Sequence, residues 1–122
     1  MEVSPTAPPM RAAIKQAKKS QHRFKLGAAI AKKNKVLVAA PNEPKTHPRF
    51  SSGQYKSLHA EGNAIYKAIR QGMNIEGSTV YVFRKNHNLA KPCPCCIKLM
   101  KKYGVKRVVY SNSQKTFSII DL

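Results

Sequence analysis

The residues whose types and spacing best suit metal chemistry are one histidine, one carboxylate and a cluster of cysteines. His59 and Glu61 stand two positions apart, and Cys93, Cys95 and Cys96 fall within four residues. Zinc in a catalytic site takes three protein ligands, commonly imidazole and thiolate, and keeps a fourth position for water. His59, Cys93 and Cys96 supply such a set, so the sequence predicts one zinc ion per chain.

A zinc site that acidifies water also needs a carboxylate beside the metal, because the released proton must be carried to the substrate. Four of the five acids stand in segments that hold none of these ligands: Glu2, Glu43, Glu76 and Asp121. Glu61 follows His59 by two residues, which places it near the zinc ion but not on it. We therefore predict that Glu61 is the catalytic residue that moves protons.

A purely structural zinc site is the alternative interpretation of the same cluster. It requires Cys95, His47 or His87 to close the fourth position. Cys95 itself is open to three roles, as a wall residue beside the site, an alternative ligand or a redox-sensitive thiol. We expect His22, His47 and His87 to be solvated or in contact with phosphate rather than bound to metal, because they lie in polar segments.

Both parts of the ligand set open a predicted helix. The apolar spacing from His59 to Gln71 predicts one buried helix, which Gly72 ends. Pro92 suits the first turn of the next helix, and Gly104 ends it. The two helix N-termini would then face one point, where the zinc site is expected.

The rest of the chain predicts a sheet and one more helix. Residues 1–9 indicate a loose lead-in to a basic helix from Met10 to about Ser20. The patterns of β-branched and aromatic residues predict five strands, at residues 24–30, 36–40, 79–83, 107–110 and 117–120. Only residues 111–116 separate the last two strands, too few for a parallel crossover, so these strands should be antiparallel. We predict a three-layer α/β/α sandwich with a mixed five-stranded sheet, the two zinc-binding helices on one face and the N-terminal helix on the other.

Composition limits the class of protein. The 122 residues fit a single domain over the whole chain, and no apolar run is long enough to cross a bilayer. No secretory signal is visible, so we expect a soluble cytoplasmic protein with no membrane partner. Lysine and arginine total 23 against five acids, and the formal net charge of +18 favours a phosphate-bearing partner. The clustered cysteines are poorly placed to form disulfides.

The His-x-Glu pattern at residues 59–61 and the Pro-Cys-x-x-Cys pattern at residues 92–96 resemble the signature of the zinc-dependent cytidine and deoxycytidylate deaminase superfamily. The similarity covers most of the chain, from Phe-Lys-Leu-Gly-Ala at 24–28 to Val-Lys-Arg-Val-Val-Tyr at 105–110. His-Ala-Glu-Gly-Asn-Ala-Ile at 59–65 is most similar to the deoxycytidylate branch.

This resemblance implies roles for several residues. By it, Glu61 is the proton shuttle, and Ala60 and Pro92 contact the base. Asn42, which follows the second strand, is implied to bind the sugar. Members of the superfamily resemble one another in assembling as dimers, tetramers or hexamers, so we also expect a homo-oligomer.

Three features discriminate among the branches of the superfamily. The predicted hairpin of the last two strands resembles free-cytidine deaminases, whereas deoxycytidylate and transfer-RNA deaminases run these strands parallel. Residues 41–57 contain no cysteine, so the second, structural zinc that accompanies the deoxycytidylate branch is not expected. Lys91 precedes Pro92 where transfer-RNA adenosine deaminases resemble one another in having glutamate, which disfavours adenine as the target base.

We therefore expect hydrolysis of a cytosine nucleoside or nucleotide to its uracil form with release of ammonia, with deoxycytidylate to deoxyuridylate as the first expectation and cytidine to uridine as the other. A substrate phosphate would suit four basic residues: Lys25, Lys45, Arg49 and Lys56. One alternative is a base-editing deaminase of single-stranded DNA or RNA, which the charge favours and the scattered aromatic residues disfavour. The other is a non-catalytic nucleic-acid-binding module that keeps a structural zinc.

Overall fold

The computed structural model describes residues 7–20, 25–33, 35–42, 60–85, 90, 92, 94–112, 114 and 116–122, and for residue 95 the backbone only. These residues form three helices and five strands. Their bounds in chain order are α1 Pro8–Lys19, β1 Leu26–Lys32, β2 Lys35–Pro41, α2 Ala60–Arg70, β3 Thr79–Arg84, α3 Pro94–Lys102, β4 Arg107–Ser111 and β5 Phe117–Asp121. None of the described helices is long and apolar enough to cross a membrane.

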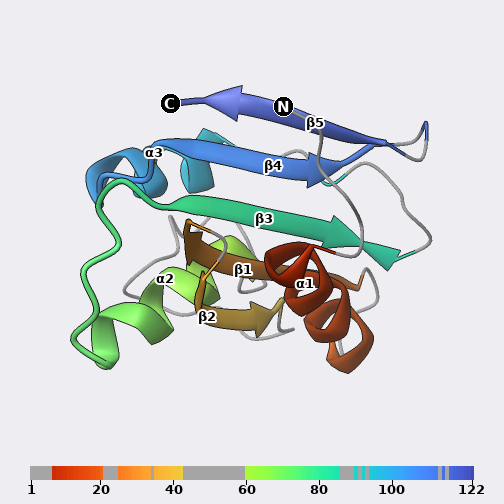
Figure 1. Cartoon of the computed structure of the whole chain (residues 1–122), viewed down its shortest axis with the longest axis horizontal. Helices are drawn as coiled ribbons and strands as arrows, with labels where there is room; N and C mark the ends of the chain where they lie inside the picture. The colour runs from red at the N-terminus through yellow and green to blue at the C-terminus, as the bar shows by residue number, and fades with distance from the viewer. Residues whose placement is uncertain are drawn as a thin grey trace.

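The five strands form one mixed sheet in the order β2-β1-β3-β4-β5 (Figure 1). β1 pairs antiparallel with both β2 and β3, whereas β3 and β4 run parallel. β4 and β5 are antiparallel, with Val109 opposite Ile119. The mixed sheet and its antiparallel last pair, predicted from the short connection between those strands, are both confirmed.

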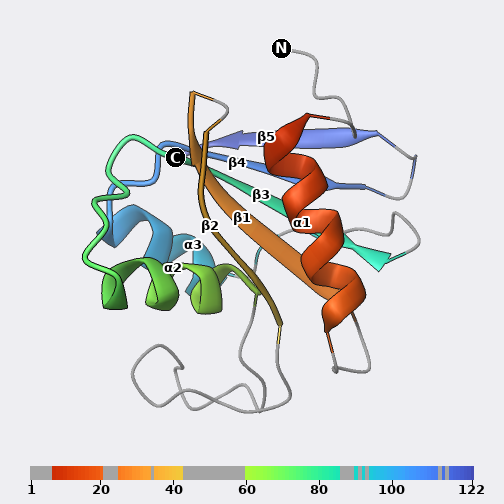
Figure 2. The same ribbon diagram turned by 60° about the horizontal axis from the view of Figure 1, so that its bottom comes forward.

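Helices cover both faces of this sheet. α1 packs on β1, β2 and β3 on one face, and α2 packs on β1 and β2 on the other face with α3 beside it (Figure 2). Along β3, Val80 and Val82 join the buried cluster under α2 and α3. Tyr81 and Phe83 contribute to the cluster under α1, as the alternation of a strand requires. The predicted three-layer α/β/α arrangement is confirmed.

α1 lies against β1 at Gly27, where there is no room for a side chain. A β-carbon on Gly27 would overlap the main-chain oxygen of Ala13 and the main-chain nitrogen of Ala17. Only glycine can occupy such a position without displacing the helix. The small side chains of Ala13 and Ala17, both buried, complete this close contact between helix and strand.

Glycines end both helices of the opposite face, as the sequence predicted. Gly72 and Gly104 follow α2 and α3 with φ values of 70° and 79°. After α3, the N–H of Gly104 donates to the carbonyl of Lys101 at 3.1 Å, and that of Val105 donates to the carbonyl of Met100 at 3.0 Å. These two bonds satisfy carbonyls that the helix end would otherwise leave without a partner. α2 ends with the same pair of bonds.

Two helices begin at other residues than the sequence indicated. α1 begins at Pro8 rather than Met10, because Pro8 and Pro9 occupy the first helical positions, where the missing N–H of proline costs nothing. The expected loose lead-in therefore does not include these two prolines. α3 begins at Pro94 rather than Pro92, and Pro94 suits the first turn for the same reason.

Candidate active site and metal centre

The predicted metal ligands lie at the N-terminal ends of α2 and α3. His59 directly precedes Ala60, the first residue of α2, and Cys93 directly precedes Pro94, the first residue of α3. His59 and Cys93 themselves lie outside the described residues. Cys96 lies in the first turn of α3, and it is buried, with 6% of its surface exposed. The structure thus describes one predicted ligand directly, together with the helix starts that adjoin the other two.

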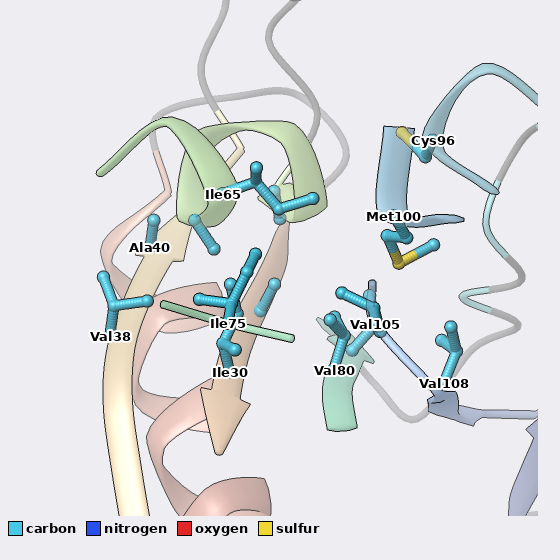
Figure 3. Packing of buried hydrophobic residues seen from close by; sticks show 14 of the residues in the cluster. Ile30, Val38, Ala40, Ile65, Ile75, Val80, Cys96, Met100, Val105 and Val108 are labelled. Carbon is cyan, nitrogen blue, oxygen red and sulfur yellow. The ribbon is translucent and has the colours of Figure 1, made fainter. Parts of the chain in front are cut away.

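The first turn of α2 packs against α3. A β-carbon placed on Gly62 would lie 3.9 Å from Cδ2 of Leu99, an ordinary van der Waals distance. Cys96 precedes Leu99 by three residues and so shares its face of α3. Figure 3 shows the Cys96 sulfur on the side of α3 nearer to α2, and Cys96 and Ala60 belong to the same buried cluster. The thiol of Cys96 therefore lies on the side of α3 that is nearer to α2 (Figure 3).

Glu61 is the only buried carboxylate among the described residues. It is the second residue of α2 and is 4% exposed. Glu76 is exposed, and the exposed Asp121 on the edge strand accepts a 2.7 Å bond from Nε of Arg107. Main-chain N–H groups at a helix start favour a negative side chain in the first turn. This is the placement expected of the proton-transfer residue, a role that stays a prediction.

Asn42 is held in one orientation at the end of β2. It is 5% exposed, and its Oδ1 accepts hydrogen bonds from the main-chain N–H of Leu26 at 2.9 Å and from the hydroxyl of Ser20. The main-chain N–H of Asn42 also donates to the carbonyl of Leu26 at 3.0 Å. Sequence reasoning missed Ser20, because a serine that follows a helix carries no signal of a partner 22 residues away.

Two further side chains that the sequence reasoning did not single out anchor α2 to β2. Nδ2 of Asn63 donates to the carbonyl of Pro41 at 2.8 Å, and Nζ of Lys67 donates to the carbonyl of Ala39 at 3.1 Å. Asn63 lies in the first turn of α2, so its bond fixes the start of this helix against the end of β2. The position of Glu61 depends on that attachment.

The residues predicted to contact a base and a phosphate are placed differently. Ala60 is 1% exposed at the start of α2, and Pro92 is buried just before the position of Cys93. Lys25 instead lines a pocket on the α1 face of the sheet, so the structure does not bring it together with Glu61. The remaining predicted phosphate contacts and the other histidines lie outside the described residues: Lys45, Arg49, Lys56, His22, His47 and His87.

The donor set fits a zinc ion. One imidazole and two thiolates are ligands that zinc prefers, and they leave one of its four positions open. Among the described residues, Cys96 and Glu61 place two ionisable groups in buried positions on neighbouring helices. A thiolate is a ligand and a nearby carboxylate a proton acceptor in zinc sites, so both side-chain types suit a zinc ion at this place.

Comparison with known proteins decides the family. The family model of the cytidine and deoxycytidylate deaminase zinc-binding region matches residues 6–112. This chain belongs to that family. Zinc is accordingly its cofactor, as the types and spacing of the predicted ligands indicated.

Deoxycytidylate deaminases of two phages are similar to part of the chain. Those of Enterobacteria phages T2 and T4 are each 40% identical to it over 74 residues, which is 61% of this chain and 35% and 34% of theirs. The chain thus spans about a third of the length of these curated relatives.

Two solved structures share the fold over most of the chain. The dCMP deaminase from the cyanophage S-TIM5 in its apo form is 30% identical, with a TM-score of 0.66 over 85% of this chain and 79% of that chain. The cytidine deaminase from Burkholderia pseudomallei is 24% identical, with a TM-score of 0.73 over 98% of this chain and 93% of that chain. The second likeness is one of fold, and it supports the deaminase-like sandwich predicted from the sequence.

Proposed function

We propose that this protein hydrolytically deaminates a cytosine nucleotide or nucleoside, with deoxycytidylate as the first substrate to test. The observation that carries the proposal is the buried carboxylate of Glu61 at the start of α2, packed beside the helix that holds the buried thiol of Cys96. Membership of the deaminase family supports the reaction type. The phage relatives support a nucleotide as substrate, since each is a deoxycytidylate deaminase.

The proposed chemistry assigns proton transfer to Glu61. Bound at His59, Cys93 and Cys96, zinc supplies a Lewis acid that lets water act as a nucleophile at neutral pH. Glu61 would accept a proton from the attacking water and pass it to the ring nitrogen, and would then take the remaining proton from the oxygen bonded to C4 and deliver it to the leaving amine. A carbon–oxygen bond forms at C4 of the base, the bond from C4 to the amine breaks, and ammonia leaves.

Substrate orientation is proposed to depend on three other residues. Ala60 and Pro92 are buried beside the ligand positions and would form part of the wall around the base. Asn42 would contact the sugar through its NH₂ group. Oδ1 of Asn42 accepts hydrogen bonds from Leu26 and Ser20, and these bonds fix the direction of the NH₂ group. A fixed donor recognises a hydroxyl more selectively than a mobile one, since no conformational freedom is lost on binding.

A polynucleotide substrate is the second candidate, and one observation favours it. The net charge of +18 would raise the local concentration of nucleic acid around the protein. An enzyme of this kind would take a single unpaired cytosine into the same pocket. Added salt should then suppress its activity on oligonucleotides far more than its activity on mononucleotides.

The test is ammonia release by the zinc-loaded protein from cytidine, deoxycytidine, their monophosphates and cytosine- or adenine-bearing oligonucleotides. The proposal predicts turnover of a cytosine monomer, with deoxycytidylate giving the highest kcat/KM. Turnover of oligonucleotides alone would contradict the monomeric substrate and support the second candidate. No ammonia from any of these compounds would contradict deamination itself.

A further inference from the structure

The solvent-exposed face of α1 carries a stripe of positive charge. Arg11, Lys15, Lys18 and Lys19 are all exposed, and their spacing places them on one side of the helix. This side lies opposite the buried residues that pack on the sheet, which include Met10. α1 contains no acidic residue, so no side chain within the helix balances these four charges.

Such a stripe costs the helix stability unless an anion compensates it. Arg11 and Lys15 are four residues apart, as are Lys15 and Lys19, and like charges at this spacing repel each other. A helix face that is merely solvated usually mixes both signs of charge, because opposite charges at this spacing stabilise it. The stripe is therefore more typical of a surface that binds the phosphates of a polyanion than of a helix face that is only solvated.

A pocket of about 360 Å³ opens beside the stripe, on the α1 face of the sheet. Ile14, Ala17 and Phe83 give it an apolar lining, and Lys18, Lys25 and Lys85 supply positive charge. This volume lies in the range of pockets that take small organic groups. Lys18 belongs both to the pocket and to the stripe, so the two features are continuous.

Two details keep this surface in place. Gly27 allows the backbone of α1 to touch β1, which fixes the height of the helix above the sheet. Nζ of Lys25 donates one of its three N–H groups to the carbonyl of Ser20 at 3.0 Å, which holds the ammonium at the rim of the pocket. A surface fixed in this way loses little conformational freedom when a ligand binds.

We infer that the α1 face binds single-stranded nucleic acid, with phosphates along the stripe and one base in the pocket against Phe83. The stripe runs from Arg11 to Lys19, about two turns of α1, and its four charges are more than a single phosphate needs. A duplex fits less well, because its bases are stacked and cannot enter an apolar pocket. Charge along the backbone path combined with an aromatic platform is the usual design for binding single strands.

The test uses a fluorescein-labelled oligonucleotide that contains only thymidine, with fluorescence anisotropy measured at several salt concentrations. Because this probe has no cytosine, its binding is independent of the proposed deamination. The triple variant Arg11→Gln, Lys15→Gln and Lys18→Gln should bind at least about tenfold more weakly. The plot of log affinity against log salt should also become shallower, with the magnitude of its negative slope reduced by about 2, since each lost phosphate contact contributes roughly 0.7.

A matched control removes the same charge from the other end of the sheet. Lys35, Lys101 and Lys106 are exposed, and they lie at the start of β2, the end of α3 and the residue before β4. Changing these three lysines to glutamine should leave affinity within about threefold of wild type, because no phosphate contact is lost there. Equal losses in the two triple variants would overturn the inference and indicate diffuse attraction. Melting temperatures of both variants check that the fold is kept.

A single substitution tests the pocket. Phe83→Leu keeps an apolar side chain but removes the stacking surface, and it should weaken oligonucleotide binding by about fivefold or more. Unchanged binding by a folded Phe83→Leu protein would contradict the base in the pocket. Inorganic phosphate or thymidine monophosphate that binds as tightly as the oligonucleotide would also overturn the inference, since it would indicate a pocket for a small anion.

Discussion

At the scale of single residues, burial separates the candidate catalytic groups from the rest of a very basic surface. Glu61 and Cys96 are 4% and 6% exposed on neighbouring helices. The sequence singled out these two residues by their types and spacing, because zinc chemistry restricts which side chains can serve as ligands and as the base. The contact between Ser20 and Asn42 could not, since it joins residues from two elements through a single hydroxyl.

The thiols near the start of α3 should differ in their importance for metal binding. Cys96→Ser should lower the zinc content of the purified protein well below one ion per chain, because a neutral hydroxyl replaces a thiolate ligand. Cys95→Ser is the matched control and should retain zinc if Cys95 is a wall residue. Metal analysis after dialysis measures both, and full zinc in Cys96→Ser would argue against Cys96 as a ligand.

Tyr81 should contribute to the pH dependence of stability. Burial raises its pKa above the ordinary value of 10.0, while the positive charge of Arg107 lowers it by less. The folded protein therefore holds this proton more tightly than the unfolded chain, so the stabilisation is complete below about pH 10 and is lost as pH rises through the folded-state pKa. As the pH rises above about 10, the free energy of unfolding of Tyr81→Phe, measured with denaturant, should fall less than that of wild type. If the unfolding free energies of the two proteins fall in parallel with pH, the raised pKa of Tyr81 is contradicted.

At the scale of elements, the sequence predicted which segments are helices and strands but not every boundary. Glycines after α2 and α3 are strong stop signals, because a positive φ suits glycine best. Prolines are weaker start signals when several occur together, and the structure begins helices at Pro8 and Pro94 rather than at the residues that the sequence favoured. The need for glycine at position 27 also depends on a helix from elsewhere in the chain, so local patterns do not reveal it.

Two glycines should respond in opposite ways to substitution by alanine. Gly27→Ala should destabilise the fold by about 1–3 kcal/mol or more, because its β-carbon would overlap the backbone of α1. Gly62→Ala should be neutral or gain up to about 1 kcal/mol, because its β-carbon meets Leu99 at 3.9 Å and alanine favours a helix. Urea unfolding measures both. A stable Gly27→Ala protein would contradict the close contact of α1 and β1.

At the scale of the whole molecule, the two faces of the sheet carry different helices and different candidate binding sites. α2 and α3, whose first residues adjoin the positions of the predicted zinc ligands, pack on one face, and α1 presents the basic stripe on the other (Figure 2). The strand order β2-β1-β3-β4-β5 could not be read from the periodicity of single segments, because it depends on pairing between distant strands. The antiparallel last pair was predictable, since a short connection permits no crossover.

The large net charge should also weaken the fold through self-repulsion. With a formal net charge of +18, like charges lie within a Debye length of one another at low salt. Raising the sodium chloride concentration from a low to a physiological level should therefore raise the Tm. Calorimetry at constant pH measures this effect, and a Tm that falls over the same range would show that attractive ion pairs outweigh the repulsion.

The most direct test of the central claim compares Glu61→Gln with wild type for zinc content and ammonia release from deoxycytidylate. Glutamine keeps the size of the side chain but cannot accept the proton, so the variant should keep its zinc and melting temperature and lose turnover by about 10²–10⁴-fold. The matched control, Glu76→Gln, removes an exposed acid and should keep full activity. A zinc-loaded, folded Glu61→Gln protein with wild-type turnover would contradict the account.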